Sequence, residues 1–143
     1  MVTEILNYLK DCPYLSDFIM NVDFLGKNPH SLSVGATGDS KVLKKYTDGD
    51  SIEKETYKLR LRLPYGIDKE KNCENSAFLE NISRWLSQRS AEGILPEMDL
   101  DKIAISAEIT FKKDGASYFT DTAVYTADFA VIFYKANQKG SKL

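Results

Sequence analysis

Apolar and polar residues alternate in three segments of the chain, as expected for β-strands that bury one face. In residues 54–64, KETYKLRLRLP, Tyr57 and the alternate leucines face one way, while Lys58, Arg60 and Arg62 face the other. In residues 103–111 and 122–134, the expected core-facing positions are Ile103, Ile105, Ala107, Ile109 and Phe111, then Tyr125, Ala127, Phe129, Val131 and Phe133. The Asp-Gly pair of the intervening KKDGAS predicts a turn, so these two strands are expected to form an antiparallel hairpin.

Helical spacing of apolar residues predicts two helices. The long one covers residues 69–91, with a stripe that includes Ile82 and Trp85, and Trp85 is expected in the core. Gly93 supplies the left-handed position that ends this helix, and Pro96 prevents its continuation. A short helix follows Thr3 and stops before residue 13, a proline.

The region between residues 18 and 50 is harder to interpret. FIMNVDFLG and HSLSVGATG are two short extended runs, which could pair as an edge hairpin, and GATGDSK is expected to be a flexible loop. The order strand, helix, strand, strand predicts an α+β fold, with an antiparallel β-sheet and helices packed on one face. The length of 143 residues and 43% hydrophobic content suit a single domain over residues 1–143, with a flexible C-terminal tail from about residue 136.

Charge and apolar content narrow the classes of partner. The net charge of −2 gives no overall positive field, so neither nucleic acid nor a membrane surface is an expected partner. No segment has the roughly 20 apolar residues of a membrane span, and the first residues lack the pattern of a signal peptide.

Residues that could carry catalysis or bind a metal are few and isolated. His30 is the single histidine and is expected in an exposed turn, and Cys12 and Cys73 are expected to be partly buried free thiols without a catalytic partner. The acidic runs DGDSIEKE and EMDLD lack the ligand spacing of a calcium loop. We therefore expect no enzyme activity, no catalytic residue, no metal and no cofactor.

The row Lys58, Arg60 and Arg62, with Lys54 in line with it, is the most informative constellation of side chains. Like charges in one row on a strand repel each other, so they need counter-charges. These could be phosphates, acidic residues of another subunit, or Glu108 and Asp128 on the neighbouring strands. The acidic loops around residues 48–50 and 97–101 could also supply them. The expected subunit interface comprises Lys58, Arg60, Arg62, Glu108 and Asp128.

Several stretches, taken in order, resemble one protein family. They are LNYLKDCPYL, VDFLG, VLKKYTDGDS, YKLRLRLPYG, NCENSAFLENISRWLSQRSAEGILPEMD and DTAVYTADFAVIFYK. The family is that of minor capsid or tail-terminator-like proteins of siphophages and prophages of Gram-positive bacteria. The most useful matching positions are the helix start (Asn72, Asn75, Phe78), the pair Trp85 and Leu86, and the corner Gly93, Leu95, Pro96.

The resemblance implies a tail-terminator-like fold and a structural virion protein at the head–tail junction, present in the bacterial cytoplasm before assembly. Such a subunit forms a ring, commonly a hexamer, that caps the tail tube and meets the tail tube protein and head–tail connector proteins. No catalytic residues come with the family. Some of its members carry a chloramphenicol-resistance label, which the lack of a histidine-rich active-site motif argues against. The alternative hypothesis is a small binding module that recognises nucleic acid or a host factor through Lys54, Lys58, Arg60 and Arg62.

Overall fold

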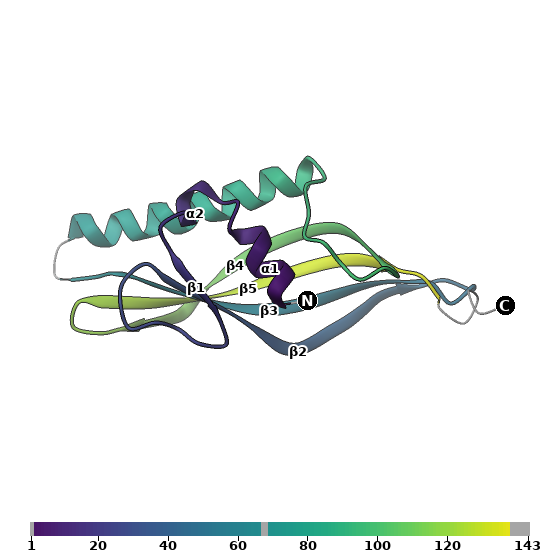
Figure 1. Cartoon of the computed structure of the whole chain (residues 1–143), viewed down its shortest axis with the longest axis horizontal. Coiled ribbons are helices and arrows are strands. Elements are labelled where there is room, and N and C mark those ends of the chain that lie inside the picture. Colours follow the sequence, from purple (N-terminus) through teal and green to yellow (C-terminus); the bar gives the residue numbers. More distant parts are fainter. Residues whose placement is uncertain (1, 67–68, 138–143) are drawn as a thin grey trace.

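The computed structural model describes residues 2–66 and 69–137, apart from the side chains of residues 69–71 and 113–115. Most of the expected C-terminal tail lies outside the described residues. The elements, in chain order, are α1 (Val2–Leu9), the short 3-10 helix η1 (Pro13–Leu15), β1 (Ile19–Val22), β2 (Ser31–Lys45), β3 (Ser51–Pro64), α2 (Lys69–Ala91), β4 (Lys102–Tyr118) and β5 (Thr122–Lys135). They form the α+β fold that the sequence predicts, with the helices on one side of the sheet (Figure 1).

The strands form one sheet in the order β1-β2-β3-β5-β4. The pairs β2–β3, β3–β5 and β4–β5 are antiparallel, as expected, whereas β1 and β2 run parallel. The edge hairpin considered for residues 18–38 is therefore wrong. Asp23 and His30 both have left-handed backbone conformations, with φ of 59° and 65°. These two reversals turn the intervening loop back, so that β2 starts beside the start of β1.

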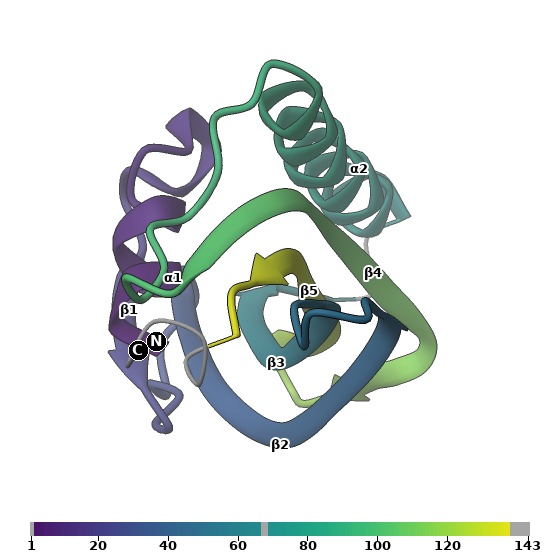
Figure 2. The ribbon, with the colours of Figure 1, turned by 90° about the vertical axis from the view of Figure 1, so that its right-hand side faces the viewer.

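The core lies between the helices and the covered face of the sheet (Figures 1 and 2). Helix α2 lies over β4, and α1 lies beside β1 and β2 (Figure 2). The alternation in β3 and β5 has the expected phase, because the leucines of β3 and Ala127, Phe129, Val131 and Phe133 of β5 are buried. Period-two burial on the strands and the apolar stripe on α2 therefore define the two sides of one core.

The alternation predicted for β4 is wrong at its start. Ala104 pairs with Phe133 and Ser106 with Ile132, so Ile105 is an extra residue that forms a bulge. The bulge shifts the phase by one residue: Ala104 packs against the core, whereas Ile103 has 68% of its surface exposed and Ile105 is also exposed. From Ala107 onwards the predicted phase holds.

The turn between β4 and β5 also lies later than predicted. The Asp-Gly pair of KKDGAS is inside β4, where a second irregularity separates the partners of Phe111 and Ala116. The chain reverses after Tyr118 instead, and the Phe119 amide donates a hydrogen bond to the carbonyl of Thr122. A strand irregularity thus takes up the residues that the sequence suggested as a turn.

The expected loop GATGDSK is likewise part of a strand, β2. A bulge between Ala36 and Ser40 accommodates the extra residues, with Gly38 at a φ of 78°. Beyond this bulge, the β2–β3 hairpin reaches past the ends of both helices (Figure 1). We call residues 40–55 the β2–β3 arm.

Helix α2 ends as the sequence predicts. Gly93 has a φ of 78°, its amide donates to the Ser90 carbonyl, and the Ile94 amide donates to the Arg89 carbonyl. This pair of bonds is a Schellman motif. Trp85, expected in the core, is only partly buried, at the margin against Tyr8, with a ring separation of 5.6 Å.

Candidate functional site: a basic groove on the uncovered face of the sheet

The row of basic residues on β3 lies in a groove on the face of the sheet that the helices leave uncovered. Lys58, Arg60 and Arg62 alternate with the buried leucines, so they project away from the core. The groove has a volume of about 520 Å³. One wall comes from the loop after β1 and the other from the end of β4 and the β4–β5 turn; the remaining lining residues are Asp23, Phe24, Leu25, Ser117, Phe119, Val124 and Thr126.

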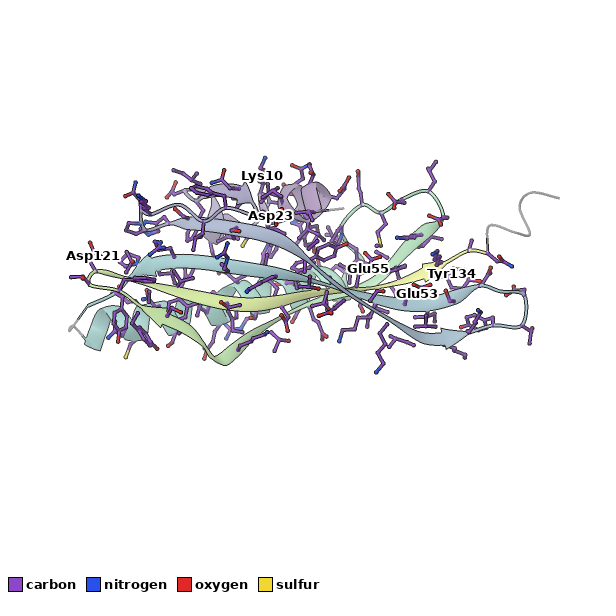
Figure 3. All side chains as sticks on the ribbon, turned by 90° about the horizontal axis from the view of Figure 1, so that it is seen from below. Lys10, Asp23, Glu53, Glu55, Asp121 and Tyr134 are labelled. Carbon is purple, nitrogen blue, oxygen red and sulfur yellow. The ribbon has the colours of Figure 1, made fainter. Side chains whose placement is uncertain are left out.

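Figure 3 looks onto this face of the sheet. Asp121 marks the end with the β4–β5 turn, and Glu53, Glu55 and Tyr134 mark the opposite end, near the β2–β3 arm. Asp23 lies at the side of the face occupied by β1 and β2. The groove therefore belongs to the turn end of the sheet.

Arg62 holds both walls of the groove. Its Nε donates a hydrogen bond to the Gly26 carbonyl at 2.9 Å, and its Nη1 donates to Oγ1 of Thr122 at 2.9 Å. The guanidinium also lies 4.9 Å from the centre of the Phe119 ring. Arg62 thus links the loop after β1 to the start of β5 and to the β4–β5 turn, and much of its bonding capacity is used inside the chain.

Lys58 and Arg60 differ from Arg62 in lacking such partners. Lys58 is exposed and lies opposite Gly35 on β2 and Asp128 on β5; Arg60 is partly buried. Among the described residues, no carboxylate lies within ion-pair distance of either side chain. Their charges therefore face the groove without a direct ion pair to the described part of the chain, although the Asp23 carboxylate also lines the groove.

The two acidic residues expected at the same interface contact other lysines. Glu108 lies 3.6 Å from Nζ of Lys54, and Asp128 lies 3.6 Å from Nζ of Lys112. The register does place Asp128 opposite Lys58, but its carboxylate pairs with β4 instead. The structure thus brings Lys58, Arg60 and Arg62 into one groove and places Glu108 and Asp128 outside its lining.

The aromatic walls of the groove are a feature that sequence reasoning missed. Phe24 is 61% exposed and Phe119 is 52% exposed, and both line the groove beside the cations. Each belongs to a loop, so no periodicity assigns it to a face. A phenylalanine next to turn residues in VDFLG and in SYFTD was the only available signal.

The single acidic residue of the lining is Asp23, against three cations. Its amide donates to the Val34 carbonyl at 3.0 Å. A Cβ atom placed on Gly35 would lie 2.8 Å from Oδ1 of Asp23, so the glycine makes room for this carboxylate. The lining keeps a positive excess, although the whole chain carries a net charge of −2. Such a groove can bind carboxylates or phosphates, with apolar groups against the phenylalanine rings.

The other residues considered for chemistry lie apart from one another. His30 is exposed and meets the ring of Phe18 edge-on at 5.4 Å. Both cysteines are free; Cys12 is buried, which raises the pKa of its thiol, and Cys73 is exposed rather than partly buried. Among the side chains that the structure describes, no group of histidine, cysteine and acidic residues is arranged to hold a metal ion.

None of the helices in the described part of the chain combines the length and apolar character of a membrane-spanning segment.

A second hollow, of about 380 Å³, lies between α1, the end of α2 and the corner at residues 94–97. Arg89 crosses it, 3.7 Å from Asp11 and 5.0 Å from the centre of the Trp85 ring. The Tyr8 hydroxyl donates to the Ile94 carbonyl at 2.7 Å, which ties α1 to the corner. These contacts assign the hollow to the packing of the helices.

Compared with known proteins, the chain matches no protein-family model, and no curated protein matches it significantly.

Proposed function

We propose that this protein is a structural subunit of a bacteriophage virion. It acts as a tail-terminator, head–tail joining or minor capsid subunit that forms a ring, as a hexamer, and caps the tail tube. The observation that carries the proposal is the basic groove, in which three cations face one carboxylate, Asp23, and neither Lys58 nor Arg60 forms an ion pair with the described residues. The resemblance of ordered sequence stretches to tail-terminator-like proteins supplies the phage context.

A ring of identical subunits needs two different surfaces on each subunit that fit each other. The groove is one such surface, because cations that face a partner unpaired are costly and require carboxylates from it. The molecule as a whole is acidic, so a second copy can supply them. In this proposal the protein has no catalytic activity and no cofactor, and its further partners are the tail tube protein and the head–tail connector.

The test is to reverse two groove charges with Lys58→Glu and Arg60→Glu and to examine tails by electron microscopy. Arg62 stays unchanged, because its hydrogen bonds hold the groove walls. The control reverses two charges on the helical side of the sheet, Lys10→Glu just after α1 and Arg84→Glu on α2, which are exposed and outside the groove. We expect tails of unregulated length with the groove variant and normal tails with the control. Normal tails with a folded groove variant would refute the use of the groove in capping.

The groove also supports the alternative function of a small binding module. Aromatic rings beside cations are the combination with which proteins bind single-stranded nucleic acid, by stacking and charge attraction. Titration with a single-stranded oligonucleotide at several salt concentrations distinguishes the two functions. Affinity that falls steeply with salt, in a protein that stays monomeric, would favour the binding module.

A further inference from the structure

We propose that the basic groove of one copy binds the acidic loop of residues 97–101 of a second copy, in a head-to-tail contact. This inference rests on the proposed assembly function in one respect, that the groove is a subunit interface. It adds which surface of the second copy the groove binds. It applies to the protein in solution as well as in a virion.

The acidic loop, Glu97–Met98–Asp99–Leu100–Asp101, connects the end of α2 to β4. Met98 packs against the core and anchors it, while Glu97 and Asp99 are exposed and Leu100 is fully exposed. The amide of Lys102 donates to the carbonyl of Asp99 at 2.9 Å, which turns the chain just before β4. A lone exposed leucine is ordinary on a protein surface. Here it stands beside acidic residues on a loop that the core fixes in place.

The loop and the groove have matching chemistry. Lys58 and Arg60 present cations in the groove, and Glu97 and Asp99 present exposed carboxylates on the loop that can pair with them. The rings of Phe24 and Phe119 give the groove an apolar margin suited to Leu100.

The other acidic candidates for the groove are engaged within the chain. Glu108 pairs with Lys54, and Asp128 pairs with Lys112. At the tip of the β2–β3 arm, Asp50 accepts hydrogen bonds from the Tyr134 hydroxyl and from the backbone amide of Asn137. Asp99 also pairs within the chain, with Lys102 at 3.8 Å, but 71% of its side chain is exposed, compared with 59% for Glu108 and 39% for Asp128. The loop is therefore the acidic segment best able to meet a partner.

The positions of loop and groove exclude a contact within one molecule. The loop precedes Lys102 at the start of β4, whereas the groove lies at the end of β4, beside Ser117 and Phe119. Figure 1 shows these two ends of β4 at opposite sides of the molecule. A contact between different surfaces of two copies leaves one groove and one loop free at its ends. Further copies can therefore add until the assembly closes as a ring.

Two complementary variants test the contact. The groove variant carries Lys58→Glu and Arg60→Glu; the loop variant carries Glu97→Lys and Asp99→Lys. A matched control for the loop variant, Glu74→Lys with Glu80→Lys, reverses two exposed charges on α2. Circular dichroism establishes that each variant is folded. Sedimentation velocity over a concentration series then measures self-association at low salt.

We expect the unmodified protein and the control to self-associate with rising concentration, and each variant alone to stay monomeric. An equimolar mixture of the two variants should associate again, because the acidic loop of the groove variant fits the basic groove of the loop variant, and the basic loop of the loop variant fits the acidic groove of the groove variant. The chain that carries all four substitutions should regain self-association. A loop variant that associates like the control, or an unmodified protein that stays monomeric throughout, would overturn the inference.

A disulfide trap gives an independent measurement. In a Cys73→Ser background, a chain with Thr126→Cys in the groove is mixed with a chain with Leu100→Cys in the loop and oxidised. A covalent dimer should form at least about tenfold faster than with Ser87→Cys, on the exposed face of α2, in place of Thr126→Cys. Equal rates would count against the contact.

The two proposals can fail separately. Tails of normal length made with the loop variant, but not with the groove variant, would contradict the loop contact and leave capping by the groove intact. Normal tails with both variants, together with lost self-association in solution, would instead contradict the virion function.

Discussion

Arg62 joins three segments that are distant in the sequence, and its replacement by alanine tests how the groove is held. The substitution removes the hydrogen bonds to Gly26 and Thr122 and the contact with the Phe119 ring. A hydrogen bond from a charged group contributes about 1.5–3 kcal/mol, and an exposed cation–π contact about 0.5–1 kcal/mol. Because Arg62 is only partly buried, water screens part of these interactions. We therefore expect Arg62→Ala to lower the free energy of unfolding by about 2–4 kcal/mol.

Arg60→Ala is the matched control for this substitution. Arg60 lies on the same strand and face, and no hydrogen bond or ion pair joins its side chain to the described part of the chain. Arg60→Ala should lower the free energy of unfolding by less than about 1 kcal/mol, mainly because the packing of the aliphatic stem is lost. Urea unfolding followed by circular dichroism measures both free energies.

Hydrogen exchange supplies a local readout for the same pair of variants. Amides in residues 24–30 and 118–121 should exchange faster in Arg62→Ala and stay unchanged in Arg60→Ala, since only Arg62 holds these loops. Equal free energies for the two variants, or unchanged exchange in both loops, would refute the view that Arg62 braces the groove.

Three further predictions concern the core and the arm. Ile103→Lys should change the unfolding free energy by less than about 0.5 kcal/mol, because Ile103 is exposed, whereas Ala107→Lys should prevent folding, because Ala107 is buried. Thermal melts of the two variants test the bulge in β4 that places these residues on opposite faces. Trp85→Ala should cost about 2–3 kcal/mol in urea unfolding, below the range for a fully buried aromatic, because Trp85 is only partly buried. The hydrogen bond to Asp50 raises the pKa of Tyr134 to about 12 from an ordinary value of 10. The raised pKa means that this bond stabilises the fold fully below pH 10 and is lost as the pH rises through about 12. Burial also raises the pKa of Tyr57, so absorbance titration should show more than one late tyrosine, and Tyr134→Phe should remove one of them.

The elements that the sequence predicted correctly are those whose signal is local. The alternation in β3 and β5 survives because each strand is paired on both sides without a register shift between them. The end of α2 follows from Gly93 itself, whose backbone conformation needs no distant partner. For these segments, the conformational preferences of the residues and the period of the apolar positions agree with the packing in the folded structure.

The errors lie where pairing with a distant strand decides the outcome. One bulge at Ile105 reverses the faces at the start of β4, and nothing within IAISA marks the extra residue. Likewise, β1 and β2 are parallel because the loop between them reverses at Asp23 and His30, and this loop bonds at Gly26 to Arg62, which is distant in the sequence. An alternating pattern alone does not report such long-range contacts.

The same distinction applies to the candidate site. The period of β3 predicts that Lys58, Arg60 and Arg62 share a face, and the structure places them in one groove. The walls that make this face a groove come from Phe24 and Phe119, on loops whose placement is non-local. The partners of Glu108 and Asp128 could not be predicted either, because they depend on the register of β4 against β5.

The β2–β3 arm has a consequence for aggregation. β1 covers β2 only from Ser31 to Val34, so the outer backbone edge of the arm has no partner strand among the described residues. An uncovered edge that displays Val42 and Leu43 is a template on which strands of unfolded or misfolded chains could add. Lys41, Lys44 and Lys45 lie along this edge, and register shifts between Ala36 and Ser40 and between Val42 and Lys44 distort the ladder. Charge repulsion and irregular backbone at such an edge oppose the addition of further strands, so replacing these lysines by apolar residues is expected to promote aggregation.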